Sequence, residues 1–395
     1  MSGPPAQAWL NALLVLVEQL QLGLLSLWHA LGLTGDSHGQ PAWPWARRMA
    51  AETLLIDLGL ARQVGLTLCA VAVAVLAMAL ALAWRRRRGV LLAGAALALV
   101  AAPWPSASLL FVPAAPTSFH ASPTRFAVDS IAHGARVYAQ HCTSCHGTDG
   151  RGEGPLAASL AVWPPTLAGP LLARRADGEL FWHVLAGMRD RQGRSTMPAF
   201  GDRLGEREVW AVIDYMKALS AGSGAEGNWP VPLRLPEMAI RCADAAPLAL
   251  SQWRGDQRVR LVTVDGTTPL PFEDPRFLTV LVTPDGQPPA QVPRFRAGCT
   301  AIASHAWQAV AAIAGQAPSR LAGTQLLADR AGWLRARGTP GRPWSDANLV
   351  CVSGPAAGTP AASSSAPSSV PDGLTALLLR MDAEPVRFVK GGFVH

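Results

Sequence analysis

Charge is scarce in this chain of 395 residues. Asp, Glu, Lys and Arg make up 15% of the sequence, whereas 50% is hydrophobic and the mean hydropathy is +0.20. This composition argues against a purely soluble chain with an ordinary polar surface. The formal net charge of +7 is spread along the chain. It therefore does not indicate nucleic-acid binding, although it is compatible with an acidic partner.

Paired cysteines are also scarce, because C-x-x-C occurs only at Cys142 and Cys145. Structural zinc sites usually need a second such pair, so its absence disfavours zinc. His146 follows directly, and C-x-x-C-H is the attachment pattern of a c-type haem. Two thiols on one turn of chain can each bond a vinyl group of one macrocycle, while the next imidazole reaches the iron. We expect one covalent haem c here, with His146 as an axial ligand.

The sequence around this motif has the pattern of a small helical domain. Ile131, Gly134 and Tyr138 share one face of an expected helix, and the glycine would permit a close helix crossing. A Gly-rich loop at 147–155 follows the histidine. Residues 204–219 have helical spacing, with Val209, Val212, Ile213 and Leu219 expected inside and Trp210 and Tyr215 expected against the macrocycle or the first helix. Residues 127–221 thus resemble an all-α class I cytochrome c domain.

The resemblance also indicates the second axial ligand. The run STMPAF at 195–200 is similar to the Met-Pro loop of that family, which implies that Met197 binds the iron opposite His146. A thioether raises the haem potential and suits an electron carrier. Met188 is the competing methionine, and its surroundings favour a core helix in which it packs. His183 and His141 are the remaining alternatives to a methionine ligand.

Two uncharged runs predict a helical hairpin in the membrane. Residues 65–84 contain no charge and are long enough to span a bilayer, and residues 89–111 are again apolar. The four arginines 85–88 between them should face the cytoplasm. Residues from about 113 onward then lie outside, where haem is attached to C-x-x-C-H in bacteria. Both arguments predict a bacterial inner-membrane protein whose later domains face the periplasm.

Residues 9–33 form a third candidate span. Glu18 is the one charged side chain there, but Gln19, Gln21 and His29 interrupt the apolar surface, so an amphipathic interfacial helix is the alternative. A cleavable signal peptide fits poorly, because no basic segment precedes the apolar run. We expect residues 1–112 to form a membrane anchor with two or three transmembrane helices, followed by a linker at 113–126.

The region after residue 228 has an α/β pattern. Residues 258–264 and 276–283 are expected strands, 304–315 an expected helix with Ser304 as its N-cap, and 325–335 an expected hairpin. With the run SQWRG at 251–255 and DRAGW at 329–333, residues 229–353 resemble a thioredoxin-like domain. Disulfide exchange needs an attacking and a resolving cysteine, and this region has no C-x-x-C. The resemblance therefore implies a binding or docking domain without redox activity.

Three cysteines and a tail complete the C-terminal part. Cys242, Cys299 and Cys351 are odd in number, so they allow at most one disulfide and leave one thiol. Ordinary buried or bridged cysteines are favoured over a copper site formed by Cys299 and His305. Residues 354–371 are rich in Ala, Ser, Gly and Pro, and we expect 354–395 to be a flexible linker and tail.

The order of these parts is similar to cytochrome-fused relatives of the copper-resistance membrane protein D family. The chain nevertheless has room for only two or three spans and lacks methionine or histidine clusters, which argues against copper transport. The sequence therefore predicts a membrane-anchored periplasmic electron carrier, not an enzyme, between a periplasmic or membrane donor and a respiratory acceptor. The alternatives are a haem sensor or enzyme with an open iron position, and a copper-homeostasis or oxidase-assembly factor that meets copper-handling or oxidase proteins.

Overall fold

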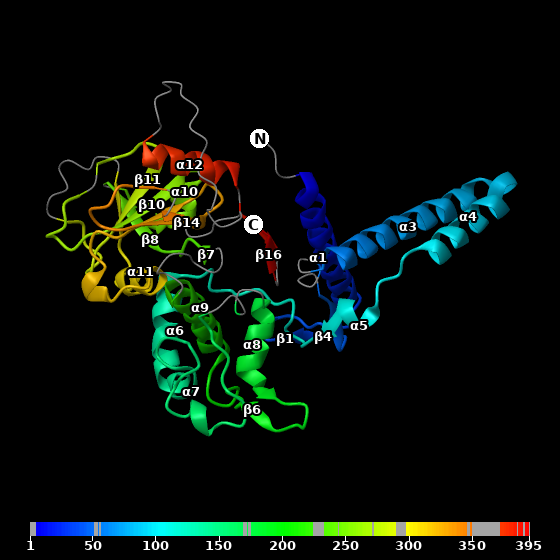
Figure 1. The fold of residues 1–395 in the computed structure, drawn as a ribbon, viewed down its shortest axis with the longest axis horizontal. Coiled ribbons are helices and arrows are strands. Elements are labelled where there is room, and N and C mark those ends of the chain that lie inside the picture. Colours follow the sequence, from blue (N-terminus) through cyan, green and yellow to red (C-terminus); the bar gives the residue numbers. More distant parts are fainter. Residues whose placement is uncertain are drawn as a thin grey trace, which may run out of the picture. The chain divides into compact units, whose positions relative to one another are not determined.

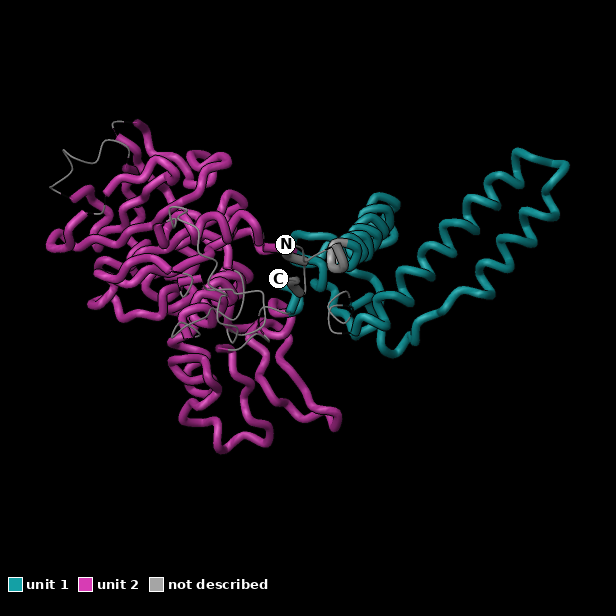
Figure 2. Tube along the Cα trace, turned by 45° about the horizontal axis from the view of Figure 1, so that its top comes forward, with its two compact units in different colours: residues 1–120, 174–179, 387–394 teal, residues 121–173, 180–386, 395 magenta. Residues whose placement is uncertain are grey.

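A computed structural model describes most of the chain (Figure 1). The described residues are 5–50, 54, 57–168, 172, 175–223, 233–243, 245–270, 272–289, 298–345, 348–349, 372–384, 386–389 and 392–394. The chain divides into two compact units, which Figure 2 shows in different colours. Unit 1 comprises residues 1–120, 174–179 and 387–394, and unit 2 comprises residues 121–173, 180–386 and 395.

Unit 1 consists mainly of apolar helices. Its helices are α1 (Pro5–Ala30), α3 (Leu58–Ala83), the short 3-10 turn η1 (Arg85–Arg87), α4 (Arg88–Ala101) and α5 (Ala107–Leu110). Its short strands are β1 (Asp36–Ser37), β2 (Gln40–Pro41), β3 (Arg47–Met49), β4 (Phe111–Pro113), β15 (Arg387–Val389) and β16 (Gly392–Val394), paired as β1–β2, β3–β4 and β15–β16. Large apolar side chains remain exposed along α1, α3 and α4.

The expected hairpin is present, but its second arm is shorter than predicted. α3 begins at the Asp57 N-cap and runs for 26 residues, and the arginine turn follows it. α4 has 14 residues, about 21 Å of helix, and is followed by Pro103 and Pro105. A proline cannot donate to the helix ladder, so the expected span 89–111 is interrupted there. Within the described residues, only 12–30 and 58–83 are long and apolar enough to cross a membrane.

The segment 174–179 belongs to unit 1, and polar contacts join it to the rest of that unit. Arg48 and Glu179 are both buried and form an ion pair of 2.5 Å. The Thr117 hydroxyl donates to the Gly178 carbonyl over 2.6 Å. A buried charge is costly unless it is paired, so the pair secures this segment to β3.

Unit 2 begins with a helical region. Its elements are α6 (Val128–His141), α7 (Thr143–His146), the 3-10 turn η2 (Ala157–Ser159), α8 (Asp177–Ala186, whose first residues belong to unit 1), β5 (Met188–Arg189), β6 (Ser195–Met197) and α9 (Glu206–Ser223). α6 and α9 cross closely, as predicted from Gly134. A Cβ atom at that position would lie 1.9 Å from the Ala211 carbonyl oxygen, so only glycine permits this approach.

The rest of unit 2 is built on an eight-stranded sheet in the order β7-β14-β13-β10-β11-β12-β8-β9. β10, β11 and β12 are parallel, and the other neighbours pair antiparallel. The strands are β7 (Leu233–Arg234), β8 (Ala239–Cys242), β9 (Leu248–Ala249), β10 (Arg258–Thr263), β11 (Phe277–Val282), β12 (Cys299–Ala301), β13 (Gln325–Ala328) and β14 (Trp333–Gly338). The helices are α10 (Leu250–Arg254), α11 (Ala306–Ala314), the 3-10 turn η4 (Pro318–Arg320) and α12 (Gly373–Ala383).

The expected strands, helix and hairpin of this region are all present within one to three residues. The helix start differs, because His305 and not Ser304 is the N-cap of α11 and its side chain makes no capping bond. Gly315 ends the helix in the left-handed conformation, as expected. β7, β8, β9 and β12 were not predicted, because strands of two to four residues are too short to show a period.

Residues 373–383 correct the prediction of a flexible tail. They form α12, which packs Leu377, Leu378 and Met381 against Phe277 and other residues of the sheet. Arg335 of β14 is buried and donates to the backbone carbonyls of the last turn of α12. The low-complexity composition of 354–371 extended the predicted tail too far, and those residues lie outside the described part of the chain.

Alternate residues of the central strands point to two different helical layers. Leu327 and Ala336 contact the cluster beneath α12, whereas Leu326 and Leu334 belong to the cluster that contains α11. This alternation is the period of two expected of a sheet covered on both faces. Figure 1 shows α12 and α11 on opposite sides of the sheet.

The helical region and the sheet share one hydrophobic core. Val128 and Ile131 of α6 and Ala218 and Ala221 of α9 are buried together with residues of α11 and the sheet. At Gly222, a Cβ atom would lie 2.1 Å from the Ala312 carbonyl oxygen. The two regions therefore form one compact unit.

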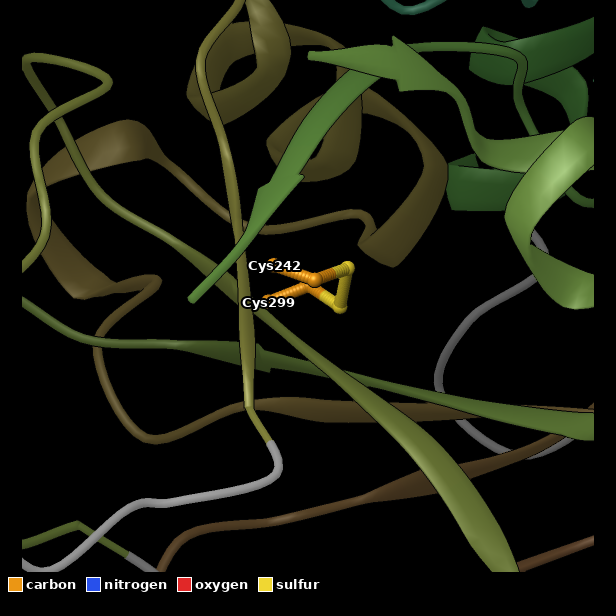
Figure 3. Close-up of a disulfide and its surroundings, with 2 residues drawn as sticks. All are labelled: Cys242 and Cys299. Carbon is orange, nitrogen blue, oxygen red and sulfur yellow. A yellow bond between two sulfur atoms is a disulfide. The ribbon is translucent and has the colours of Figure 1, made fainter. Parts of the chain in front are cut away.

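A disulfide joins two neighbouring strands of the sheet. Cys242 of β8 and Cys299 of β12 are directly paired in the antiparallel ladder, and their sulfur atoms are bonded (Figure 3). This agrees with the prediction of bridged cysteines and of at most one disulfide. It also excludes Cys299 as a free thiolate ligand for copper. The third cysteine, Cys351, lies outside the described residues.

Candidate functional site

The C-x-x-C-H motif lies where α6 passes into α7. Cys142 is both the C-cap of α6 and the N-cap of α7. The backbone N–H groups of Cys145 and His146 donate to the Cys142 carbonyl, so the motif forms a single tight turn. This is the arrangement expected from the spacing, with both thiols and the imidazole on one short segment.

The Gly-rich loop after the motif is hydrogen-bonded back onto it. Gly152 donates to the His146 carbonyl, Gly154 to the Cys145 carbonyl and Leu156 to the Ser144 carbonyl, at 2.8–3.1 Å. Gly147 and Gly152 both have positive φ, which disfavours other residues. A Cβ atom at Gly152 would lie 2.3 Å from the Pro164 carbonyl oxygen. The glycines therefore keep the motif in a fixed backbone frame.

Burial determines the electrostatics of the motif. It lowers the pKa of His146, and the backbone carbonyl of Pro165 acts in the opposite direction. It also raises the pKa of Cys142 to about 11, with a smaller contribution from Cys145. The imidazole is thus neutral at pH 7, the form in which histidine binds a metal. Pro165 is a contributor that the sequence analysis missed, and the Pro-Pro pair at 164–165 was the available signal.

Tyr138 is hydrogen-bonded to the residue that follows the C-x-x-C-H motif. It is buried, its hydroxyl donates to the Gly147 carbonyl over 2.9 Å, and burial raises its pKa well above the ordinary value. Its ring lies 5.3 Å from that of Tyr215 on α9. The expected contact of Tyr215 with the first helix is therefore present. A buried hydroxyl needs a partner, and the carbonyl supplies it.

Met197 is positioned by the β5–β6 hairpin. It is directly paired with Met188 in the ladder, is partly buried, and packs against the cluster that Cys142 also borders. Gly187 turns the chain into β5 at positive φ, where a Cβ atom would lie 2.6 Å from the Met197 carbonyl oxygen. Cys142 and Met197 therefore border one hydrophobic cluster, as their expected roles require.

The predicted environment of Met188 was wrong. α8 ends at Ala186, so Met188 lies in β5 and is 38% exposed, not packed in a core helix. The glycine before it is the physical reason, because its left-handed conformation ends the helix. Core packing therefore does not engage the Met188 side chain. Met197 is nevertheless the more buried of the two methionines.

Aromatic stacking joins α8 to α9 inside this cluster. The rings of Phe181 and Trp210 are stacked with centroids 4.5 Å apart. Trp210, expected against the macrocycle or the first helix, thus stacks on α8 and lies in one cluster with Val137 and Tyr138 of α6. Val209, Val212 and Ile213 are fully buried, and Leu219 is partly buried, as predicted.

The other candidate ligands lie in different surroundings. The His141 ring is 6.3 Å from that of Phe200, and His183 lies on α8. His305 contacts Asp129 over 3.2 Å, and Cys299 is bonded to Cys242. Within the described part of the chain, no group of three or more His, Cys, Asp or Glu side chains is arranged to hold a metal ion.

The residues of the motif fit a covalently bound haem. Two thiols and a neutral imidazole share one turn, and the cluster beside them is apolar. The buried Nδ1 of His146 makes no well-formed hydrogen bond to the described residues, although the Pro165 carbonyl influences it.

Comparison with known proteins supports this fit. Residues 129–216 match the family described as cytochrome C oxidase, cbb3-type, subunit III. A 106-residue stretch is 34% identical to the gluconate 2-dehydrogenase cytochrome c subunit of Pantoea cypripedii, covering 25% of this chain and 22% of that protein. The chain thus spans about a fifth of the length of this relative.

A solved structure is also similar to part of the chain. It is the Kuenenia stuttgartiensis reducing HAO-like protein complex Kustc0457/Kustc0458, at 21% identity and a TM-score of 0.23, covering 32% of this chain and 59% of that one. The family match and the dehydrogenase subunit agree with the motif geometry. The chain therefore contains a c-type cytochrome domain, which binds haem c covalently.

Proposed function

We propose that this protein is a membrane-anchored cytochrome that carries single electrons, with His146 and Met197 as the axial ligands of one haem. The main support is the hairpin pairing that sets Met197 against the cluster bordered by Cys142. When bound, the haem supplies the redox couple, and a methionine thioether raises its potential. A site with both axial positions occupied by protein suits electron transfer rather than substrate chemistry.

The residues of the chain hold and shield this group. Cys142 and Cys145 form the covalent links, and the hydrogen-bonded Gly-rich loop fixes His146. The apolar cluster of α6, α8 and α9 excludes water from one side of the site. Rigid, dry surroundings reduce the rearrangement that accompanies a change of charge.

The anchor is proposed to lie in the bacterial inner membrane. α1 and α3 have the length and composition of spanning helices, and α4 with the segment after it is the second arm of the hairpin. Arg85–Arg88 would face the cytoplasm and the cytochrome domain the periplasm. Protease added to spheroplasts should remove the haem-bearing region. Full protection of haem in intact spheroplasts would contradict this orientation.

The electron-transfer partners are proposed from the two relatives. One is named as a dehydrogenase cytochrome subunit, and the matched family is named for an oxidase subunit. We propose a dehydrogenase or another periplasmic or membrane donor, and a respiratory oxidase as the acceptor. Neither assignment follows from the fold, because the chain covers only a small part of the relative.

The thioredoxin-like assignment of the sheet region is also a proposal. It is supported by the order β10, β11, α11 and the β13–β14 hairpin. A binding or docking role remains the inference for a region without C-x-x-C. Copper delivery by Cys299 and His305 is not favoured, because the Cys299 sulfur is already in a disulfide.

The axial ligation can be tested on the full chain in detergent. The oxidised protein should show a far-red methionine–iron band, and the reduced protein should not bind carbon monoxide. Met197→Ala should abolish the band and open the iron to carbon monoxide, whereas the control Met188→Ala should do neither. Carbon monoxide binding by the unaltered protein would favour a sensor or enzyme instead. Loss of the band in Met188→Ala alone would assign the ligand to Met188.

A further inference from the structure

A small cavity of about 110 Å³ lies beside the turn between β13 and β14. The two segments that carry the thioredoxin-like resemblance, 251–255 and 329–333, both contribute to it. The proposed electron transfer uses neither of them. The polar side chains at the cavity are Arg234 of β7, Arg254 and Ser251 of α10, and Glu237.

The Arg234 side chain is held in place by the turn. Its guanidinium lies over the Trp333 ring, 3.9 Å from the ring centroid. Its Nη1 donates to the Ala331 carbonyl over 3.2 Å. Stacking leaves the edge of a guanidinium accessible, and one backbone carbonyl uses only one of its five N–H donors. The Arg234 guanidinium therefore has a fixed orientation. Within the described residues, one of its N–H donors is engaged by a carbonyl, which leaves donors for a ligand.

The Arg254 side chain is held on the same turn. Its Nη1 donates to the Arg330 carbonyl. A Cβ atom at Gly332 would lie 3.3 Å from the guanidinium carbon of Arg254, so this glycine leaves room for the arginine. Gly332 also has φ of +82°, which disfavours any other residue. The turn thus accommodates a second fixed guanidinium.

Two acidic side chains, Glu237 and Asp329, lie near these arginines, but both are hydrogen-bonded to other groups. Among the described residues, neither guanidinium forms an ion pair with a carboxylate. Asp329 accepts from the Trp333 backbone and from Arg335, and Glu237 Oε1 accepts from the backbone of Met238 and Ser251. Burial lowers the pKa of Arg234, Asp329 opposes this, and repulsion by Arg254 adds to it. Two like charges kept together attract an anion.

We propose that this cavity binds a phosphate-type oxyanion between Arg234 and Arg254. Two fixed guanidinium forks match the oxygen geometry of such an anion, and the exposed Ser251 hydroxyl is a further donor. The volume suits a single small group, because pockets for larger ligands measure about 300 Å³ or more. The anion is either free phosphate or the phosphate group of a lipid.

The test is a calorimetric titration of the full haem-loaded chain in detergent with inorganic phosphate. Saturable binding to one site is expected at constant ionic strength set with chloride. Arg234→Gln and Arg254→Gln should each weaken binding about ten- to hundredfold, the range for a lost charge-assisted hydrogen bond. Arg320→Gln is the matched control, since Arg320 is exposed on η4 and does not line the cavity. It should leave the affinity unchanged.

Thermal unfolding with and without phosphate is a second test, for the case that a glutamine variant folds poorly. Phosphate should raise the thermal midpoint of the unaltered chain but not that of Arg254→Lys, which keeps the charge and loses the fork. No saturable binding, equal displacement by chloride, or unchanged affinity in both glutamine variants would overturn the proposal. An equal midpoint rise in Arg254→Lys would also count against it.

The source of the phosphate is decided by a parallel titration with dihexanoyl phosphatidic acid, a soluble short-chain lipid. Binding of both probes with loss in Arg254→Gln indicates that the phosphate group alone is recognised. Binding of the lipid alone, with the same loss, identifies a lipid headgroup site. If neither probe binds, the two arginines serve only to hold the turn and the proposal fails.

Discussion

Two helix pairs in this protein are packed in opposite ways. α6 and α9 enclose large side chains, and the pair approaches closely at Gly134. In α3 and α4 the buried positions beyond residue 70 are alanines, whereas Leu82, Val90 and Val100 are 74–82% exposed. The first pair is built to remove apolar surface from water. The second leaves it outside, as helices in lipid do, where small residues line the contact.

The two pairs differ in which side chains they bury, although both consist of α-helices. Both pairs are rich in apolar residues, and both contain glycine. Gly134 of α6 and Gly222 of α9 each lie against another backbone, whereas Gly94 of α4 has no atom within 4 Å of an added Cβ. Substitutions at matched positions, either in the two units or within unit 2, test this difference and are ordered from the largest expected effect to the smallest.

The largest effect is expected at the disulfide. Cys299→Ser should lower the free energy of unfolding of unit 2 by about 4 kcal/mol, from the loop-closure entropy of cysteines 57 residues apart. The matched control Cys69→Ser changes an exposed, free cysteine of α3 and should have little effect. The haem Soret band followed through denaturant in mild detergent would measure both. Equal midpoints for the two variants would refute this expectation.

The next effect is at the close helix crossing. Gly134→Ala should destabilise unit 2 by about 3 kcal/mol, because the methyl group overlaps the Ala211 carbonyl and the helices must separate. The matched change Gly94→Ala should be neutral or stabilise α4 by up to about 1 kcal/mol. Thermal midpoints of the two variants, measured with the same haem signal, provide the check. A neutral Gly134→Ala would mean that α6 and α9 do not cross at this distance.

A smaller loss is expected at the junction between the helical region and the sheet. Gly222→Ala places a methyl group 2.1 Å from the Ala312 carbonyl and should cost about 2 kcal/mol. Gly205→Ala, whose nearest atom would be 3.8 Å away, is the control. Hydrogen exchange of α11 should quicken in the first variant only. Unchanged exchange there would show that α9 and α11 are not in contact.

The smallest effect depends on pH. The Arg276 side chain lowers the pKa of Asp274 below its ordinary 3.8, so the pair stabilises the folded state above that pH and loses this contribution as the pH falls through the folded-state pKa. Asp274→Asn should therefore cost less than about 1 kcal/mol at pH 6, and less again at pH 3. Asp256→Asn, at an exposed carboxylate, controls for lost surface charge. The check is the denaturant midpoint of each protein at both pH values. A larger difference between the unaltered protein and Asp274→Asn at pH 3 than at pH 6 would contradict the prediction.

The sequence alone indicated a covalently bound haem c, which the family match supports, because the signal is local. Cys142, Cys145 and His146 must be adjacent for the chemistry, and no tertiary information is needed. Gly134 was informative for a similar reason, since a glycine on the apolar face of a helix indicates a close helix crossing. By contrast, the apolar residues before Met188 predicted a helix that includes it. The preceding Gly187, which ends the helix, was not recognised as a stop.

The shared core was not predicted because its contacts are between small residues. Ala218 and Ala221 on α9 and Ala309 and Ala314 on α11 have little apolar surface each, so periodicity hardly detects them. The pairing of Cys242 with Cys299 depends on the register of two strands far apart in sequence. Such long-range placement is decided by tertiary packing and cannot be inferred from local composition.

Because Val128, Ile131 and the end of α9 are buried against the sheet, the cytochrome domain is not an independent building block. Excising it would expose an apolar face to water and invite aggregation. A recombinant haem protein cut at residue 222 is thus a poor surrogate for the whole. The same attachment means that the haem cannot swing toward a partner on a flexible tether within unit 2. A redox partner must instead dock on unit 2 as a whole, with the helical region and the sheet already packed together.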